Sequence, residues 1–144
     1  MDISSIKTRL AEIQESVDGI SRAYAQGPSS LPETDLPLFV NFAGPSAREA
    51  GDGDTIYESR DFLMRLYVVP AQSGLDGEAE SQVEEYISSI YSAFDAEQLL
   101  AAVPFVINAV IVSDGGVVVM PYAGVQFLGI EFRLRVRAFR PATY

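Results

Sequence analysis

The chain has 144 residues, with 20 Asp and Glu against 10 Lys and Arg, and it contains neither His nor Cys. This length favours one compact domain, residues 1–144, and a net charge of -10 opposes binding to nucleic acid or anionic membranes, which requires a basic surface. The lack of His and Cys excludes thiolate nucleophiles, disulfides, Cys-ligated zinc and the usual general base at neutral pH.

An amphipathic helix is predicted at the start of the chain, within residues 1–26. Its apolar residues recur at spacings of three and four and form one narrow stripe, Ile3, Ile6, Leu10, Ile13, Val17 and Ile20. Three heptads are few for a coiled coil, so the stripe indicates docking on a sheet or on a neighbouring subunit. The Gly27-Pro28 pair ends the helical region, and residues 22–24 are expected to form its last turn.

Little regular structure is predicted between residues 27 and 54. Residues 27–37 contain three prolines and are typical of an extended strap. A short strand is expected over 38–42. Residues 43–54 are rich in glycine and acidic side chains and predict an exposed, mobile acidic loop.

The middle of the chain predicts a long strand followed by a second amphipathic helix. From Ile56 to Val69 apolar and polar side chains alternate, so one face of the strand is apolar and the other is largely charged. After Pro70, apolar residues at helical spacing continue to Phe94, with acids in the first turn, where they complement the helix dipole.

The last third of the chain predicts a β-meander. The expected strands are 105–113, 117–122 and 127–140, with a tight hairpin turn at Asp114-Gly115-Gly116. The sum is an α+β fold, in which an N-terminal helix and a second amphipathic helix pack on a mainly antiparallel sheet of four to five strands. Two strands of about fourteen residues exceed the usual length, so their ends are expected to project as a hairpin or to meet another subunit.

No membrane-spanning segment is expected. The N-terminus has alternating charges and no apolar signal core, and the longest apolar stretch, from Leu99 to Val112, contains Pro104 and Asn108 and is too short for a bilayer.

No catalytic, cofactor or metal site is predicted. Asp52 and Asp54, with Glu49 and Glu58, lack the spacing of a calcium-binding EF-hand loop and are better interpreted as solvated acids. No serine has a His or a well-placed Lys to activate it, so we expect the protein not to be an enzyme.

A row of arginines on the last strand is the most specific polar feature. Arg133, Arg135 and Arg137 lie on one face of that strand. They either pair with Glu58 and Asp61 of the other long strand, or form a basic strip that faces a ring lumen or an acidic neighbour. Four further residues complete the set of candidate interface or lumen residues, Tyr57 and Tyr67 of the long strand and the loop acids Asp52 and Asp54.

Three segments together resemble a known family. They are "GISRAYAQGPSSLPETDLPLFVNF" (19–42), "RDFLMRLYVVP" (60–70) and "YAGVQFLGIEFRLRVRAF" (122–139). In this combination the chain resembles the tail-terminator, or tail-completion, proteins of tailed phages, which join head and tail.

The resemblance implies a structural virion protein, assembled in the host cytoplasm. Its subunits would form a homo-oligomeric ring, usually six-fold, that caps the tail tube and contacts the tube protein and the head–neck connectors. DNA would pass through the lumen without specific binding. Two other interpretations stay open, a head-completion or stopper connector and a small α+β ligand-binding domain with a pocket formed by Asp61 and Tyr57 or Tyr67.

Overall fold

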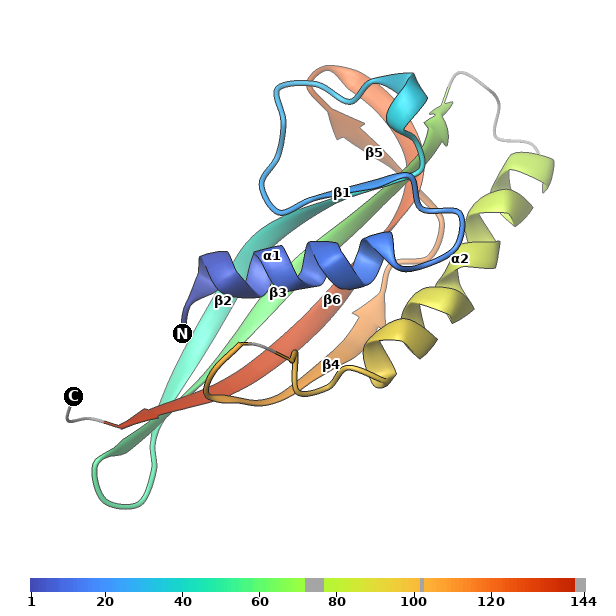
Figure 1. Ribbon diagram of the computed structural model, residues 1–144. Helices are drawn as coiled ribbons and strands as arrows, with labels where there is room; N and C mark the ends of the chain where they lie inside the picture. The colour runs from blue at the N-terminus through green and yellow to red at the C-terminus, as the bar shows by residue number, and fades with distance from the viewer. Residues whose placement is uncertain (72–76, 102, 142–144) are drawn as a thin grey trace.

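The computed structural model describes residues 1–71, 77–101 and 103–141, and it has the predicted α+β architecture. Two helices lie against one face of a six-stranded, mostly antiparallel sheet (Figure 1). The elements in chain order are α1 (Ile3–Glu15), β1 (Arg22–Tyr24), the 3-10 helix η1 (Glu33–Asp35), β2 (Leu38–Ala50), β3 (Thr55–Pro70), α2 (Gly77–Asp95), β4 (Val106–Asp114), β5 (Val118–Tyr122) and β6 (Val125–Pro141).

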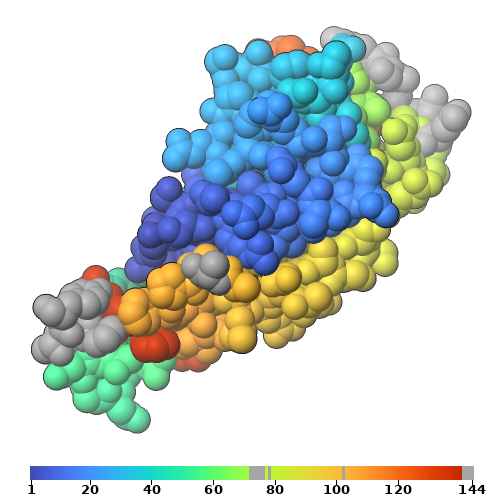
Figure 2. All heavy atoms as spheres, in the orientation of Figure 1, coloured from blue at the N-terminus to red at the C-terminus, as the bar shows by residue number. Residues whose placement is uncertain are grey.

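Strands β3 and β6 form the centre of the sheet, whose order is β1-β2-β3-β6-β4. Strand β1 is parallel to β2, and the other paired strands are antiparallel. The apolar faces predicted for the two long strands are confirmed, because Phe62, Met64 and Leu66 of β3 and the matching residues of β6 are fully buried beneath the helices. Figure 2 shows α1, α2 and the loop after α2 covering this side of the sheet.

The apolar stripe of the first helix anchors it to the sheet. Ile6 and Leu10 are fully buried, and Asp2 caps the helix by accepting a hydrogen bond from the Ser5 amide at 3.1 Å. The predicted helical region is too long, however, since α1 ends at Glu15 and residues 22–24 form β1 instead of a last turn. Gly19 has φ +90°, a left-handed conformation that turns the chain away from the helix axis.

A second, smaller core lies on the opposite face of the sheet, at one end. It is closed by the predicted strap, residues 27–37, which is not wholly irregular because it contains η1. The Tyr122 hydroxyl donates to the Pro28 carbonyl and ties the strap to β5. The buried members of this core are Leu31, Leu38, Val40, Tyr67, Met120 and Phe127.

The mobile loop predicted over residues 43–54 is wrong for most of its length. Strand β2 continues to Ala50 and pairs with β3, with a register shift between Ala43 and Ser46. These edge residues need no apolar side chains, because backbone hydrogen bonds hold them and the Arg60 guanidinium donates to the Gly44 carbonyl at 2.8 Å. The true turn is confined to residues 51–54.

The predicted hairpin at Asp114-Gly115-Gly116 is also wrong. Strands β4 and β5 both pair with β6 and follow one another along the same edge of it. The Gly115 amide donates to the Glu131 carbonyl at 3.0 Å, so the chain continues along β6 through the glycine pair instead of reversing. The tight turn is Ala123-Gly124, between β5 and β6, where both residues have positive φ, as a type I′ hairpin requires.

The long strands extend past the helices as a narrow projection (Figures 1 and 2). We call this projection the arm and define it as residues 48–56 and 140–141, where β2, β3 and the end of β6 remain paired. This agrees with the prediction that the ends of the long strands leave the domain body as a hairpin. Neither described helix combines the length and the hydrophobicity that a membrane span requires.

Candidate interaction surface

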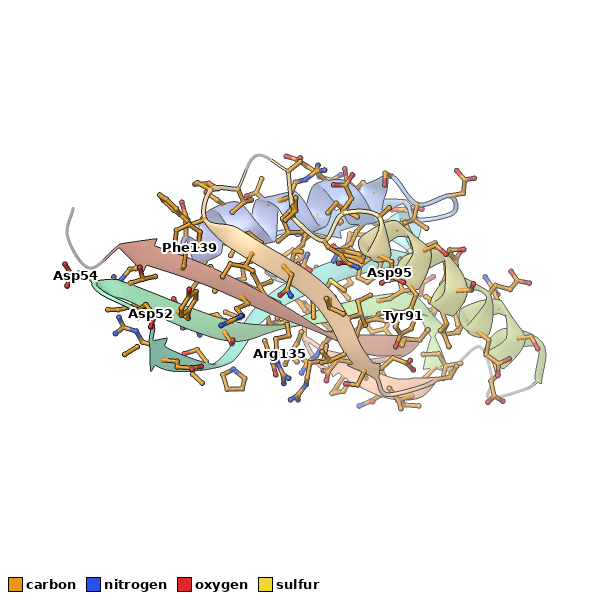
Figure 3. The ribbon with its side chains drawn as sticks, turned by 90° about the horizontal axis from the view of Figure 1, so that it is seen from below. Asp52, Asp54, Tyr91, Asp95, Arg135 and Phe139 are labelled. Atoms are coloured by element: carbon orange, nitrogen blue, oxygen red, sulfur yellow. The ribbon has the colours of Figure 1, made fainter. Side chains whose placement is uncertain are left out.

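One face of the sheet is covered by neither α1 nor α2 and carries most of the predicted site residues. Between the second core and the arm, this surface presents the side chains of β3 and β6 that alternate with the buried ones. We call it the open face. Figure 3 shows Arg135 on the side of the sheet away from α1. Its charged members are Asp61, Arg65, Glu131, Arg133, Arg135 and Arg137.

Asp61 organises two of the three predicted arginines. Its carboxylate accepts hydrogen bonds from Arg135 Nε at 2.9 Å and Nη2 at 3.4 Å, and from Arg133 Nη1 at 3.4 Å. The register explains this contact, since Asp61 lies directly opposite Arg135 in the β3–β6 pair. Of the two alternatives for the arginine row, pairing within the subunit therefore occurs at Asp61.

The other predicted acid, Glu58, does not reach the arginine row. It lies on the helical side of β3 and contacts Arg60 at 3.3 Å and the N-terminal amine of Met1 at 3.4 Å. The prediction of a Glu58 pair with the arginine row is wrong because neighbouring positions of a strand point to opposite faces.

The two arginines that Asp61 holds remain accessible to a further partner. The side chains of Arg133 and Arg135 are 44% and 53% exposed, whereas that of Asp61 is 9% exposed. The hydrogen bond and the charge of Asp61 raise the pKa of the Arg135 guanidinium. The carboxylate is thus shielded while both guanidiniums present their free N–H groups to solvent.

The remaining charges of the open face are also fixed in place. Arg137 lies over the ring of Tyr57, with its guanidinium carbon 4.6 Å from the ring centre, so these two predicted residues do meet. Arg65 donates from Nε to Glu131 at 2.7 Å and lies over Phe42 at 4.7 Å. The face therefore holds four arginines against two acids, an excess of positive charge in an acidic protein.

Arg65 was not among the predicted interface residues. Its place in the alternation of β3, two positions from each of Leu63 and Tyr67, is the signal that could have found it.

Tyr67 does not belong to the accessible surface, which corrects its prediction as an interface residue. It is fully buried in the second core, edge-on to Tyr122 and Phe127 with ring centres 5.6 Å apart in each case. Burial raises the pKa of its hydroxyl, and the neighbouring Arg65 guanidinium opposes part of that rise. The distances and angles around the hydroxyl give no hydrogen bond to a described residue. The alternation placed Tyr67 on the correct face, but the strap covers that end of the face.

Asp52 and Asp54 lie far from the arginines, at the tip of the arm (Figure 3). Both are exposed in the turn between β2 and β3, where Gly53 has φ +64°. The predicted site residues therefore separate into a buried tyrosine, an arm tip with two acids, and the open face with Tyr57 and three arginines.

The helical side of the protein carries an acidic surface. Glu80, Glu84 and Glu85 of α2 are exposed, and none of them forms an ion pair with another described residue. By contrast, Arg9 on α1 contacts Glu12 at 3.0 Å and Glu97 at 3.3 Å. We call the three exposed glutamates the acidic ridge.

A polar groove of about 750 Å³ lies beside α1 and β1, and none of its lining residues belongs to the open face. It is lined by side chains such as Lys7, Glu15 and Arg22. Within the described ranges, no three acidic side chains come together in an arrangement suited to a metal ion.

No protein-family model matches this chain, and no curated protein matches it significantly in sequence.

Proposed function

We propose that this chain is a structural subunit of a phage virion, which forms a ring at the head-proximal end of the tail. The ring terminates the tail tube and joins it to the neck of the head. The observation that carries this proposal is the open face, an uncovered and positively charged sheet surface continuous with a projecting arm. Such a surface is suited to contacts with other protein subunits.

The shape of the subunit supports assembly through unlike surfaces. An arm that extends past the helices, a charged sheet face and an acidic helix occupy different sides of one chain. Contacts between unlike surfaces are heterologous, and they generate closed rings when the rotation between neighbours closes. The resemblance to tail-terminator proteins further implies that the ring is six-fold and that its partners are the tube protein and the neck connectors.

The geometry favours this role over a ligand-binding pocket built on Asp61 and tyrosine. The Asp61 carboxylate is occupied by two guanidiniums, and the Tyr67 hydroxyl is enclosed by the strap. Tyr57 is covered by Arg137. Two of the three groups that such a pocket would use are therefore already engaged, and the third, the Tyr67 hydroxyl, is buried in the second core.

The net negative charge of the chain is compatible with a ring through which DNA passes. DNA passes through the lumen of the ring without specific binding, and a net charge of -10 opposes tight retention of phosphates. The subunit is assembled in the host cytoplasm and remains in the virion.

The test is electron microscopy of the purified chain, alone and with the tail-tube protein of the same phage. The proposal predicts ring-shaped particles in negative stain, either free or at one end of each tube. A protein that is strictly monomeric at high concentration and binds no tube would contradict it.

A further inference from the structure

The geometry points to a specific contact between copies of this chain. We propose that the open face of one copy binds the acidic ridge on α2 of the next copy, and that repetition of this contact closes the ring. This inference rests on the proposed ring function and adds the surfaces through which neighbours recognise each other.

The open face needs an acidic partner from outside the subunit. Its four arginines exceed its two acids, so internal pairing leaves positive charge uncompensated. Arg133 and Arg135 are about half exposed, and Asp61 holds both guanidiniums in a fixed orientation. Arginine forms bidentate bonds with carboxylates, and prior orientation reduces the conformational entropy lost when a neighbour binds.

The acidic ridge has the complementary property. Glu80 and Glu84 are four residues apart on α2 and therefore adjacent on its surface, where like charges repel. Glu85 adds a third exposed carboxylate, and no described residue neutralises any of the three. A basic surface from a neighbour would remove this repulsion.

The two surfaces lie in different layers of the subunit. Helix α2 contributes Val83, Ile90 and Phe94 to the core on the helical side of the sheet, whereas Arg135 points away from that core (Figure 3). One subunit therefore cannot bring its own arginines onto its own ridge. The contact joins unlike surfaces of two copies, so it is heterologous and able to form a ring.

Charge also favours a second copy over nucleic acid as the occupant of the open face. Two of the four arginines share Asp61, a third is paired with Glu131, and the whole chain repels phosphate. A second copy carries the same net charge of -10 and is also repelled at long range, so the attraction is local, between the exposed guanidiniums of one copy and the three ridge carboxylates of the next.

The experiment uses two variants of the full chain that each lose one surface. The first, D61N/R133Q/R135Q, removes the arginines together with the acid that would otherwise stay buried and unpaired. The second, E80Q/E84Q/E85Q, neutralises the ridge at exposed helical positions. A control, K7Q/R22Q, removes two positive charges outside the open face, and circular dichroism verifies that all three fold.

Sedimentation velocity gives the readout. Each single-surface variant is expected to associate roughly tenfold more weakly than the unmodified chain, or worse, while the control assembles normally. A mixture of the two variants in equal amounts still contains one intact open face and one intact ridge, so it is expected to form a heterodimer. Raising the salt from about 50 mM to about 500 mM should reduce the difference in association between the unmodified chain and the two variants, because salt screens the arginine–glutamate contact.

Each contrary result has a distinct meaning. If the chain forms rings that ignore both variants and salt, the proposed contact is overturned and the ring function stands. If the mixture gives no heterodimer although both variants fold and are monomeric, the contact is not between these two surfaces. If a DNA duplex binds the open face while assembly is unaffected by D61N/R133Q/R135Q, the proposal that a second copy occupies this face is overturned. A chain that is monomeric and binds no tube overturns both proposals.

Discussion

A buried amide pair between Gln14 of α1 and Asn41 of β2 holds the first helix on the sheet. Gln14 Nε2 donates to Asn41 Oδ1 at 2.7 Å, and Asn41 Nδ2 donates to Gln14 Oε1 at 2.9 Å and to the Tyr24 carbonyl at 3.0 Å. Gln14 is 0% exposed and Asn41 is 1% exposed. Because no water reaches the pair, each amide depends on the other.

The Gln14→Leu substitution is expected to lower the free energy of unfolding by about 3 kcal/mol. It removes two hydrogen bonds, each worth a net contribution of about 1 kcal/mol, and leaves the Asn41 Oδ1 atom buried without a partner, which costs about 1–3 kcal/mol. The larger apolar surface of the leucine offsets about 1 kcal/mol of that loss.

The substitution of the other partner, Asn41→Leu, leaves both polar atoms of the Gln14 amide unpaired. It should lower the free energy of unfolding by about 3 kcal/mol. The double variant Q14L/N41L leaves neither amide behind, so its loss should be smaller than either single loss. The coupling between the two positions is then about 3 kcal/mol or more.

Urea unfolding of the four proteins measures these differences, with equal m-values as the check that only stability has changed. If the losses of the two single variants simply add in the double variant, the amides are not coupled and the reasoning is refuted.

Three further predictions concern the sheet and its tyrosines. A Cβ at Gly129 would collide with the Leu66 carbonyl oxygen of β3, so G129A should lower stability by about 3 kcal/mol or more in thermal unfolding. Burial, and then the hydrogen bond to Asp114, raises the pKa of Tyr91 from 10 to about 12, so its stabilising contribution is complete below pH 10 and lost towards pH 12. Y91F should therefore lose less stability over that window than the unmodified chain, and equal losses in a pH series of urea titrations would contradict this. The Tyr67 hydroxyl is buried without a described partner, so Y67F should be neutral or raise stability by about 1 kcal/mol, and a clear loss would show that the hydroxyl is satisfied.

Side-chain alternation predicted the faces of the central strands correctly. Strands β3 and β6 each have one face buried beneath the helices, so a change of register by one residue would expose the apolar set of side chains. The same alternation placed Asp61 and the arginines together on the opposite face. Local sequence was sufficient here because each strand alone shows which side is apolar.

The wrong predictions concern residues whose structure depends on contacts with segments that are distant in the sequence. Tyr67 is buried by the strap together with Tyr122 and Phe127, and no local sequence pattern predicts these distant contacts. The outer half of β2 has the glycine and proline content of a loop, yet backbone pairing with β3 makes it a strand. The Asp114-Gly115-Gly116 sequence is typical of a hairpin, but pairing of the following residues with β6 prevents the reversal.

The central claim is that this chain is a ring subunit between the head and the tail of a phage. Gold labelling of intact particles of the phage that encodes it, with an antibody raised against the purified chain, tests that claim most directly. The proposed function predicts label at the head–tail junction and nowhere else on the particle. Particles that carry no label, or that carry it on the capsid surface or the tail tip, would contradict the account.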